Sequence, residues 1–228
     1  MFDFLKNPDY DLVGAFWMTI QLTFFSAIGS LIWGTILVGM RVSPVPIMRG
    51  FATVYVNIFR NTPLTVIIIF SSLGLFSTLG INLASPDSPT SLADNGFRLA
   101  VLGFVVYTST FVCESLRSGI NTVPVGQAEA ARALGLSFLQ VLRLIVLPQA
   151  FRAVVAPLAN VLIALLKNTT VAAVIGVAEA SLLMSTMVEN ESDSLFLVFL
   201  VFAAVFVALI LPLGLFLGWV AKKVEVKR

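Results

Sequence analysis

Two long runs without a charged residue constrain this chain more than any other feature of its sequence. They cover residues 14–40 and 194–221, and each exceeds the ~20 apolar residues with which a helix crosses a ~30 Å hydrocarbon core. Backbone polar groups inside a bilayer must be satisfied within the segment, so runs of this length predict α-helices. The whole chain is 58% hydrophobic and 11% charged, whereas soluble domains are about half apolar and a quarter charged. The sequence therefore predicts an all-α integral membrane protein.

Five spans are expected within one domain that covers residues 14–221. The predicted helices are residues 14–40, 61–82, 97–118, 150–180 and 195–220. The fourth is longer than the hydrocarbon core even when tilted, so we expect it to break near residues 167–170. Residues 49–60 form a separate amphipathic segment that is expected to lie flat on the cytoplasmic face.

The charged residues orient these spans. Basic residues follow the first span, surround residues 121–148 and end the chain, whereas acids such as Glu189, Glu191 and Asp193 dominate the other connections. By the positive-inside rule, the N-terminus lies outside and the C-terminus lies in the cytoplasm. Residues 83–96 and 183–194 are then outer loops, and residues 121–148 form a cytoplasmic loop.

Composition also argues against several functional classes. The chain has no His and a single Cys, Cys113, which we expect to be a buried packing residue. This argues against an intrachain disulfide, a metal site ligated by His and Cys, and a His-based catalytic triad. The net charge of +2 gives no sign of nucleic-acid binding. A Walker A motif does not occur in the sequence, so we expect no bound cofactor in this chain and no ATPase activity of its own.

The cytoplasmic loop has clear helix signals. Pro124 suits the first turn of a helix, the alanines that follow favour helix, and Gly135 is a natural stop. Ser137 and Gln140 then have the spacing of a capping box that begins a second helix. The pattern predicts a helix–turn–helix at the cytoplasmic surface. On composition alone, it could be a tight connector or a docking element for a partner.

The residues of this loop resemble a known motif. Glu129-Ala130-Ala131, Gly135 and residues 145–148 ("IVLP") are similar to the EAA loop of permease subunits of type I ABC importers. The segments "YVNIFRNTPL", "ESLRSGI", "LPQAFRAVVAPLAN" and "LLKNTT" resemble the polar amino-acid subgroup of that family. The resemblance covers residues 14–220, and Asn168 departs from it because Asp is commoner there.

The resemblance implies a function and a set of partners. The chain would form half of the translocation pathway of an ATP-driven polar amino-acid importer, and its overall likeness is to permeases for glutamate. Its partners would be a cytoplasmic ATP-binding subunit that binds the ATP, a second permease, identical or paralogous, and an extracytoplasmic amino-acid-binding protein. The location would be the bacterial cell membrane, as a multi-pass protein. The residues expected to couple the chain to the ATPase are Gln127, Glu129, Ala130, Ala131 and Gly135. The alternative is a stand-alone channel or secondary carrier, although proton-coupled carriers place carboxylates or His in mid-membrane.

Lys167 is the basic residue that the sequence places deep inside a predicted span. A lysine there costs at least ~2.5 kcal/mol on insertion scales, so it needs a polar partner or water. Lys167, Asn168, Thr169 and Thr170 are therefore candidates for the substrate path or gate. In the other interpretation, Lys167 fixes the helix break or the contact between two permeases.

The acids Glu114 and Glu179 are expected to have structural roles. Glu114 and Arg117 are expected to form a local ion pair near the cytoplasmic interface, because they lie three residues apart on a helix. Glu179 is expected to lie at the membrane interface, near the outer end of the fourth span.

Overall fold

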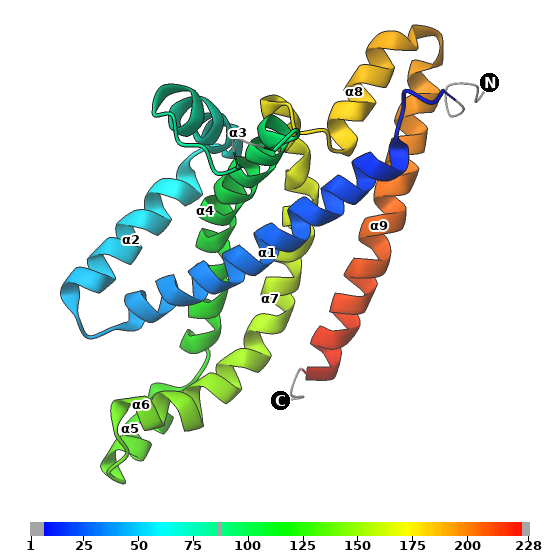
Figure 1. The fold of residues 1–228 in the computed structure, drawn as a ribbon. Coiled ribbons are helices and arrows are strands. Elements are labelled where there is room, and N and C mark those ends of the chain that lie inside the picture. Colours follow the sequence, from blue (N-terminus) through cyan, green and yellow to red (C-terminus); the bar gives the residue numbers. More distant parts are fainter. Residues whose placement is uncertain (1–6, 86–87, 225–228) are drawn as a thin grey trace.

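The computed structural model describes residues 7–85 and 88–224, and all the regular secondary structure in these residues is helical. Four long helices form the body of the protein (Figure 1): α1 (Leu12–Val42), α4 (Ser91–Asn121), α7 (Leu147–Asn168) and α9 (Leu195–Val224). The shorter elements are α2 (Pro46–Asn61), α3 (Leu64–Ile69), η2 (Phe70–Thr78), α5 (Val125–Ala133), α6 (Phe138–Val141), η3 (Leu142–Val146), η4 (Thr169–Ile175), α8 (Ala180–Asn190) and η5 (Ser192–Ser194). The prediction of an all-α membrane protein is confirmed.

The described residues contain four or five candidate membrane spans, depending on how one bent pair is counted. Residues 12–42, 91–121, 138–175 and 195–223 are each long and apolar enough to cross a membrane. The fifth candidate is the pair α2 and α3–η2, whose axes differ by 105° across the break at Thr62 and Pro63. Proline removes a backbone donor and disfavours helix at the residue before it, which accounts for the position of this break.

Two predictions about this region are wrong. The helix expected over residues 61–82 is shorter: an α-helix begins at Leu64, a π-helix follows it, and the helical structure ends at Thr78. The segment expected to lie flat, residues 49–60, belongs to α2, which runs back alongside α1 and α4 (Figure 1). Its Tyr55 hydroxyl donates to the Val106 carbonyl of α4 at 3.1 Å. The sequence pattern showed an amphipathic helix but not the surface against which it packs.

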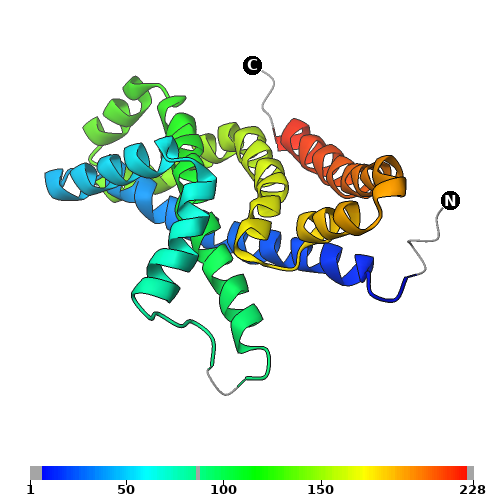
Figure 2. The same cartoon turned by 90° about the horizontal axis from the view of Figure 1, so that it is seen from above.

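Helix α4 lies at the centre of the packing and contacts α1, α2 and α7. Small residues allow these close approaches. A Cβ atom added to Gly34 of α1 would lie 2.9 Å from the Ser109 carbonyl oxygen of α4. A Cβ added to Gly119 of α4 would lie 2.1 Å from Val154 Cγ1 of α7. Close backbone contact through small residues is the usual way in which transmembrane helices associate. Seen from above in Figure 2, α7 lies between α4 and α9.

The last two helices form a hairpin beside the N-terminal half of α1. Phe16 of α1 stacks on Phe202 of α9 with ring centroids 5.6 Å apart, and Met187 of α8 is fully buried in the same cluster. The outer loop expected over residues 183–194 is therefore largely the helix α8, and that prediction is wrong. Likewise, α4 already begins at Ser91, within the outer loop expected over residues 83–96.

Glu179 explains why α8 was missed. Its side chain is fully buried, and its carboxylate accepts from the backbone N–H groups of Ser181 and Leu182 at 2.9 and 3.0 Å. The Ala180 N–H donates to the hydroxyl of Thr19 on α1 at 3.2 Å. Glu179 thus begins a new helix, although helix N-caps are usually Ser, Thr, Asp or Asn.

Candidate functional site

The α5–α6 hairpin projects from the end of the bundle opposite the α8–α9 tip (Figure 1). Its turn has the geometry of a Schellman motif: the Gly135 N–H donates to the Arg132 carbonyl at 2.9 Å, and the Leu136 N–H donates to the Ala131 carbonyl at 3.2 Å. Gly135 has φ of 90°. Ser137 and Gln140 form the expected capping box. The predicted helix–turn–helix, with its stop and its cap, is confirmed.

The hairpin presents apolar side chains that no described residue covers. Leu134 is 85% exposed, and Val125 and Leu139 are 71% and 70% exposed. Among the predicted coupling residues, Ala131 is buried, whereas Gln127, Glu129, Ala130 and Gly135 are exposed. Exposed apolar groups gathered beside polar ones are typical of an interaction surface.

A hydrogen bond that the sequence analysis missed joins this hairpin to the membrane helix α7. The Gln149 side-chain nitrogen, Nε2, donates to Gln127 Oε1 at 2.7 Å and to the Ile145 carbonyl at 3.0 Å. The two glutamines are 22 residues apart. No local spacing rule relates residues at that separation, so the sequence carried no signal for the contact.

The four residues proposed for the substrate path do not share one environment. Lys167 lies in the last turn of α7 and is exposed, and Asn168 ends that helix. Thr169 is fully buried and its hydroxyl donates to the Leu166 carbonyl at 2.6 Å, while the Thr170 hydroxyl donates to the Lys167 carbonyl at 2.8 Å. Both hydroxyls are thus engaged with the backbone. The α-helical geometry persists through Asn168, then becomes 3₁₀ over η4 and stops at Gly176, which has φ of 77°.

The exposed face of α7 differs from the exposed faces of its neighbours. Between residues 152 and 168, its exposed side chains are Arg152, Ala153, Ala156, Asn160, Ala164 and Lys167. The exposed faces of α1 and α9, in contrast, carry large apolar side chains such as Ile28, Ile32, Leu211 and Leu215. A surface with Asn and Lys is costly against lipid tails. The α7 face is therefore suited to water or to another protein rather than to lipid.

Glu114 is the centre of a charged cluster. Its carboxylate accepts a hydrogen bond from Arg41 of α1, and it lies 3.7 Å from Arg60 of α2 and 3.9 Å from Arg117 of α4. The expected Glu114–Arg117 pair is present, but Arg41 is the nearer partner and its side chain is only 9% exposed. One carboxylate thus connects three helices, an arrangement that only the tertiary fold brings about.

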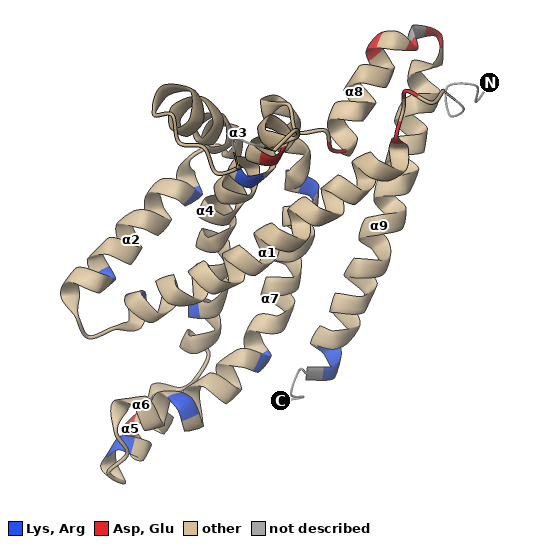
Figure 3. Cartoon of the chain, viewed as in Figure 1, with Lys and Arg blue, Asp and Glu red and all other residues tan. Residues whose placement is uncertain are grey.

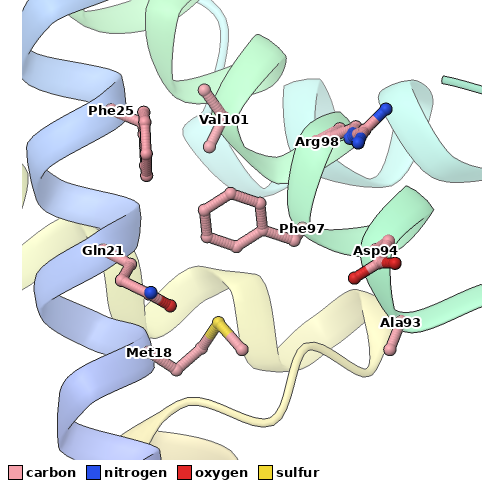
Figure 4. Close-up of a pocket in the computed structure, with 8 residues that line it drawn as sticks. All are labelled: Met18, Gln21, Phe25, Ala93, Asp94, Phe97, Arg98 and Val101. Carbon is pink, nitrogen blue, oxygen red and sulfur yellow. The ribbon is translucent and has the colours of Figure 1, made fainter. Parts of the chain in front are cut away.

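Acidic and basic residues separate along the molecule (Figure 3). Acids gather around the α8–α9 tip and the start of α1, and bases gather at the end that holds the α5–α6 hairpin. A cavity of about 550 Å³ opens between the N-terminal halves of α1 and α4, as Figure 4 shows. Its charged residues are already engaged: Asp94 accepts from the Thr90 hydroxyl at 2.8 Å, and Arg98 donates to the Leu83 carbonyl. The cavity is otherwise mostly apolar, with the Gln21 amide as its remaining polar group.

Comparison with known proteins identifies the family. The model of a family described as "Binding-protein-dependent transport system inner membrane component" matches residues 30–226. The chain belongs to this family. It is 62% identical over 217 residues to the glutamate transport system permease protein GluC of Corynebacterium efficiens, and 59% identical to that of Corynebacterium glutamicum. Both matches cover 95% of each chain. This membership makes the chain a membrane permease subunit of an ABC importer, as the EAA-like loop implied.

Solved structures support the same fold. A crystal structure of an amino-acid ABC transporter with histidines matches with a TM-score of 0.83 at 24% identity and covers 97% of both chains. The inward-facing MetNI methionine ABC transporter matches with a TM-score of 0.69 at 18% identity, over 94% of this chain and 96% of that one. Similarity at this level of identity describes the fold and leaves the substrate open.

Proposed function

We propose that this family member is the permease of a glutamate importer in the bacterial cell membrane, where it pairs with a second permease to enclose the pathway. The two Corynebacterium relatives are named as glutamate transport permeases. More distant relatives are named for arginine, glutamine and glutamate/aspartate. The whole set favours a polar amino acid, and the two high-identity relatives favour glutamate.

The exposed α5–α6 hairpin is the observation on which the ATP-driven mechanism rests. A cytoplasmic ATP-binding subunit would cover the apolar side chains of Val125, Leu134 and Leu139, and Glu129 would meet a polar group beside them. The hairpin lies at the basic end of the molecule (Figure 3), which the positive-inside rule assigns to the cytoplasm. The N-terminus and the α8–α9 tip would then lie outside.

The small and polar face of α7 is our candidate for the surface that lines the pathway. Lys167 at its outer end could attract a substrate carboxylate, and no described carboxylate lies within ion-pair distance of it. Asn168, which is half-buried beside it, would contribute an amide. Thr169 and Thr170 would hold the transition from α7 to η4 through their backbone hydrogen bonds. In the alternative, Lys167 stabilises the contact with the second permease.

The acidic tip of α8–α9 is the candidate docking surface for an amino-acid-binding protein. Glu189 and Asp193 are exposed and Glu191 is partly exposed. A row of acids would repel an anionic amino acid over roughly 8 Å at physiological salt. Delivery by a binding protein avoids that repulsion.

Copurification tests the proposal most simply. A tagged chain expressed with its second permease and the ATP-binding subunit should retain that subunit in detergent. Glu129→Lys should weaken the retention, whereas Glu191→Lys, the same charge reversal at the other end of the molecule, should not. If no ATPase is retained and the purified chain alone moves an amino acid across liposome membranes, the chain is a secondary carrier or channel and the proposal is wrong.

A further inference from the structure

Helix α5 has few direct contacts with the membrane helices. It packs against α6 and η3, which continue into α7 as one helical stretch over residues 138–175. Within the described part of the chain, the Gln149–Gln127 bond is the one side-chain hydrogen bond that joins α5 directly to α7. Gln149 also donates to the Ile145 carbonyl in η3, so a single amide of α7 contacts both α5 and η3.

The residues next to Gln149 are packed tightly against α4. Ala150 is 3% exposed, and Val154, one turn later, is 1% exposed. Both lie close to Gly119 of α4, since a Cβ added at Gly119 would lie 2.9 Å from the Ala150 carbonyl oxygen and 2.1 Å from Val154 Cγ1. Interiors packed at this density move as discrete units and do not deform continuously. The first turns of α7 are therefore a natural point about which the helix could rotate on α4.

Beyond this contact, α7 continues as one helix to Asn168 and contains Pro157, which lacks the backbone N–H for one hydrogen bond of the helix. Its 22 residues span about 33 Å, and Lys167 lies about 27 Å from Gln149 along the axis. Both residues are exposed, as are Ala153, Asn160 and Ala164 on the turns between them. A displacement at Gln149 would thus be transmitted to the end of α7 that holds the proposed path residues.

We infer that Gln149 is a positioning residue that transmits movement of α5 to α7 through its hydrogen bond with Gln127. The inference rests on the proposed coupling function of the hairpin and assigns it a mechanical connection. When the ATP-binding subunit moves α5, the Gln127 amide moves the first turn of α7, and the close contact at Gly119 converts this movement into a rotation of the helix. Gln149 touches neither ATP nor substrate in this account.

Substitutions of Gln127 and Gln149 can either remove or keep the hydrogen bond between their side-chain amides. Gln149→Ala removes the donor, and with it the side-chain hydrogen bond between α5 and α7, while α5 keeps its packing on α6 and η3. Gln149→Glu should keep the bond to Gln127, because the Gln127 side chain can turn its NH₂ group toward the new carboxylate, although the carboxylate cannot donate to the Ile145 carbonyl. Gln127→Ala removes the same bond from the other side. If the bond is what matters, Gln127→Ala and Gln149→Ala together should have no greater effect than either alone, since interacting residues are not additive.

The experiment measures amino-acid molecules transported per ATP hydrolysed by the full complex in proteoliposomes, with binding protein and glutamate present. Loss of one neutral hydrogen bond should lower this ratio roughly two- to tenfold in Gln149→Ala. Gln149→Glu should give a ratio near that of the wild type. Retention of the ATP-binding subunit should be unchanged in the Gln149 variants, because Gln149 lies outside the apolar docking surface. A structural defect alone would lower the yield or the retention and leave the ratio intact.

Two outcomes separate the inference from the function on which it rests. An unchanged transport ratio in Gln149→Ala, or additive losses in the double variant, would overturn the inference while leaving a coupled wild-type importer. A wild-type complex that neither retains an ATPase nor requires ATP would overturn the proposed function itself.

Discussion

Replacement of Gly135 tests the geometry of the α5–α6 turn in isolation. Gly135 has φ of 90°, a left-handed conformation that glycine adopts without strain and other L-residues do not. A Cβ added there would meet nothing within 4 Å, so a substitution introduces backbone strain without a clash. Gly126, the second residue of α5, also has open space around its added Cβ but lies in ordinary helical conformation. The two positions thus share open surroundings and differ in φ.

The expected size of the effect follows from these conformations. A non-glycine residue in the left-handed region costs about 1–2 kcal/mol, and the reduced freedom of the unfolded chain returns about 0.4–1 kcal/mol. Gly135→Ala should thus destabilise the turn by about 1 kcal/mol, or roughly fivefold in its opening equilibrium. Gly135→Asp should cost about 0.3–1 kcal/mol more, because its carboxylate opposes the dipole at the C-terminus of α5. Gly126→Ala should instead stabilise the helix by about 0.5–1 kcal/mol.

Hydrogen–deuterium exchange of the peptides that cover residues 125–140 measures this opening directly. Exchange at the turn should quicken about fivefold in Gly135→Ala and more in Gly135→Asp, and should slow in Gly126→Ala. Gly135→Asn should lie close to wild type, since asparagine tolerates this conformation. The same order, with Asp worst, is expected for substrate-stimulated ATPase activity of the complex. Identical exchange in all the variants would refute the assigned turn, and wild-type coupling in Gly135→Asp despite fast exchange would refute its role.

Three further substitutions probe packing, capping and the proposed path. Gly119→Ala should destabilise the protein by about 1–3 kcal/mol and lower its midpoint of thermal unfolding in detergent, because the methyl group would overlap Val154. Gly39→Ala, which has nothing within 4 Å in the interior of α1, should instead stabilise by up to about 1 kcal/mol, and an equal loss of stability in the two variants would count against the close contact. Glu179→Ala should cost about 0.5–2 kcal/mol by removing the cap of α8 and should speed proteolysis within α8, so unchanged proteolysis would contradict the capping role. Lys167→Met should strongly reduce uptake by the complex; if Lys167 contacts substrate, Lys167→Arg should retain transport with a higher half-saturation concentration when the binding protein is bypassed. Wild-type uptake in Lys167→Met would exclude both proposed roles of that residue.

Local signals predicted the α5–α6 hairpin accurately. The stop at Gly135 and the cap formed by Ser137 and Gln140 depend on residues within a few positions of each other. Such interactions are encoded by spacing and residue type, so the sequence alone could show them. The long apolar runs likewise predicted α1 and α9, because length and composition decide whether a helix can cross the membrane.

The features that were missed depend on contacts between distant segments. The pairing of Glu114 with Arg41 joins residues 73 positions apart, and the Gln149–Gln127 bond joins two helices of unrelated pattern. The course of α2 along α4 depends on the Tyr55 contact, which an amphipathic pattern does not specify. The burial of Glu179 and its capping of α8 were missed because Glu is an unusual N-cap, and the backbone N–H groups that compensate for its burial belong to a helix that the sequence pattern did not predict.

Glutamate uptake into proteoliposomes tests the central claim most directly. The liposomes would contain this chain, its second permease and the ATP-binding subunit, with ATP enclosed on the side of the α5–α6 hairpin and binding protein on the other side. The account predicts glutamate accumulation that requires both ATP and binding protein and that falls sharply in Gly135→Asp. Accumulation by this chain alone, driven by an ion gradient and indifferent to ATP, would contradict it.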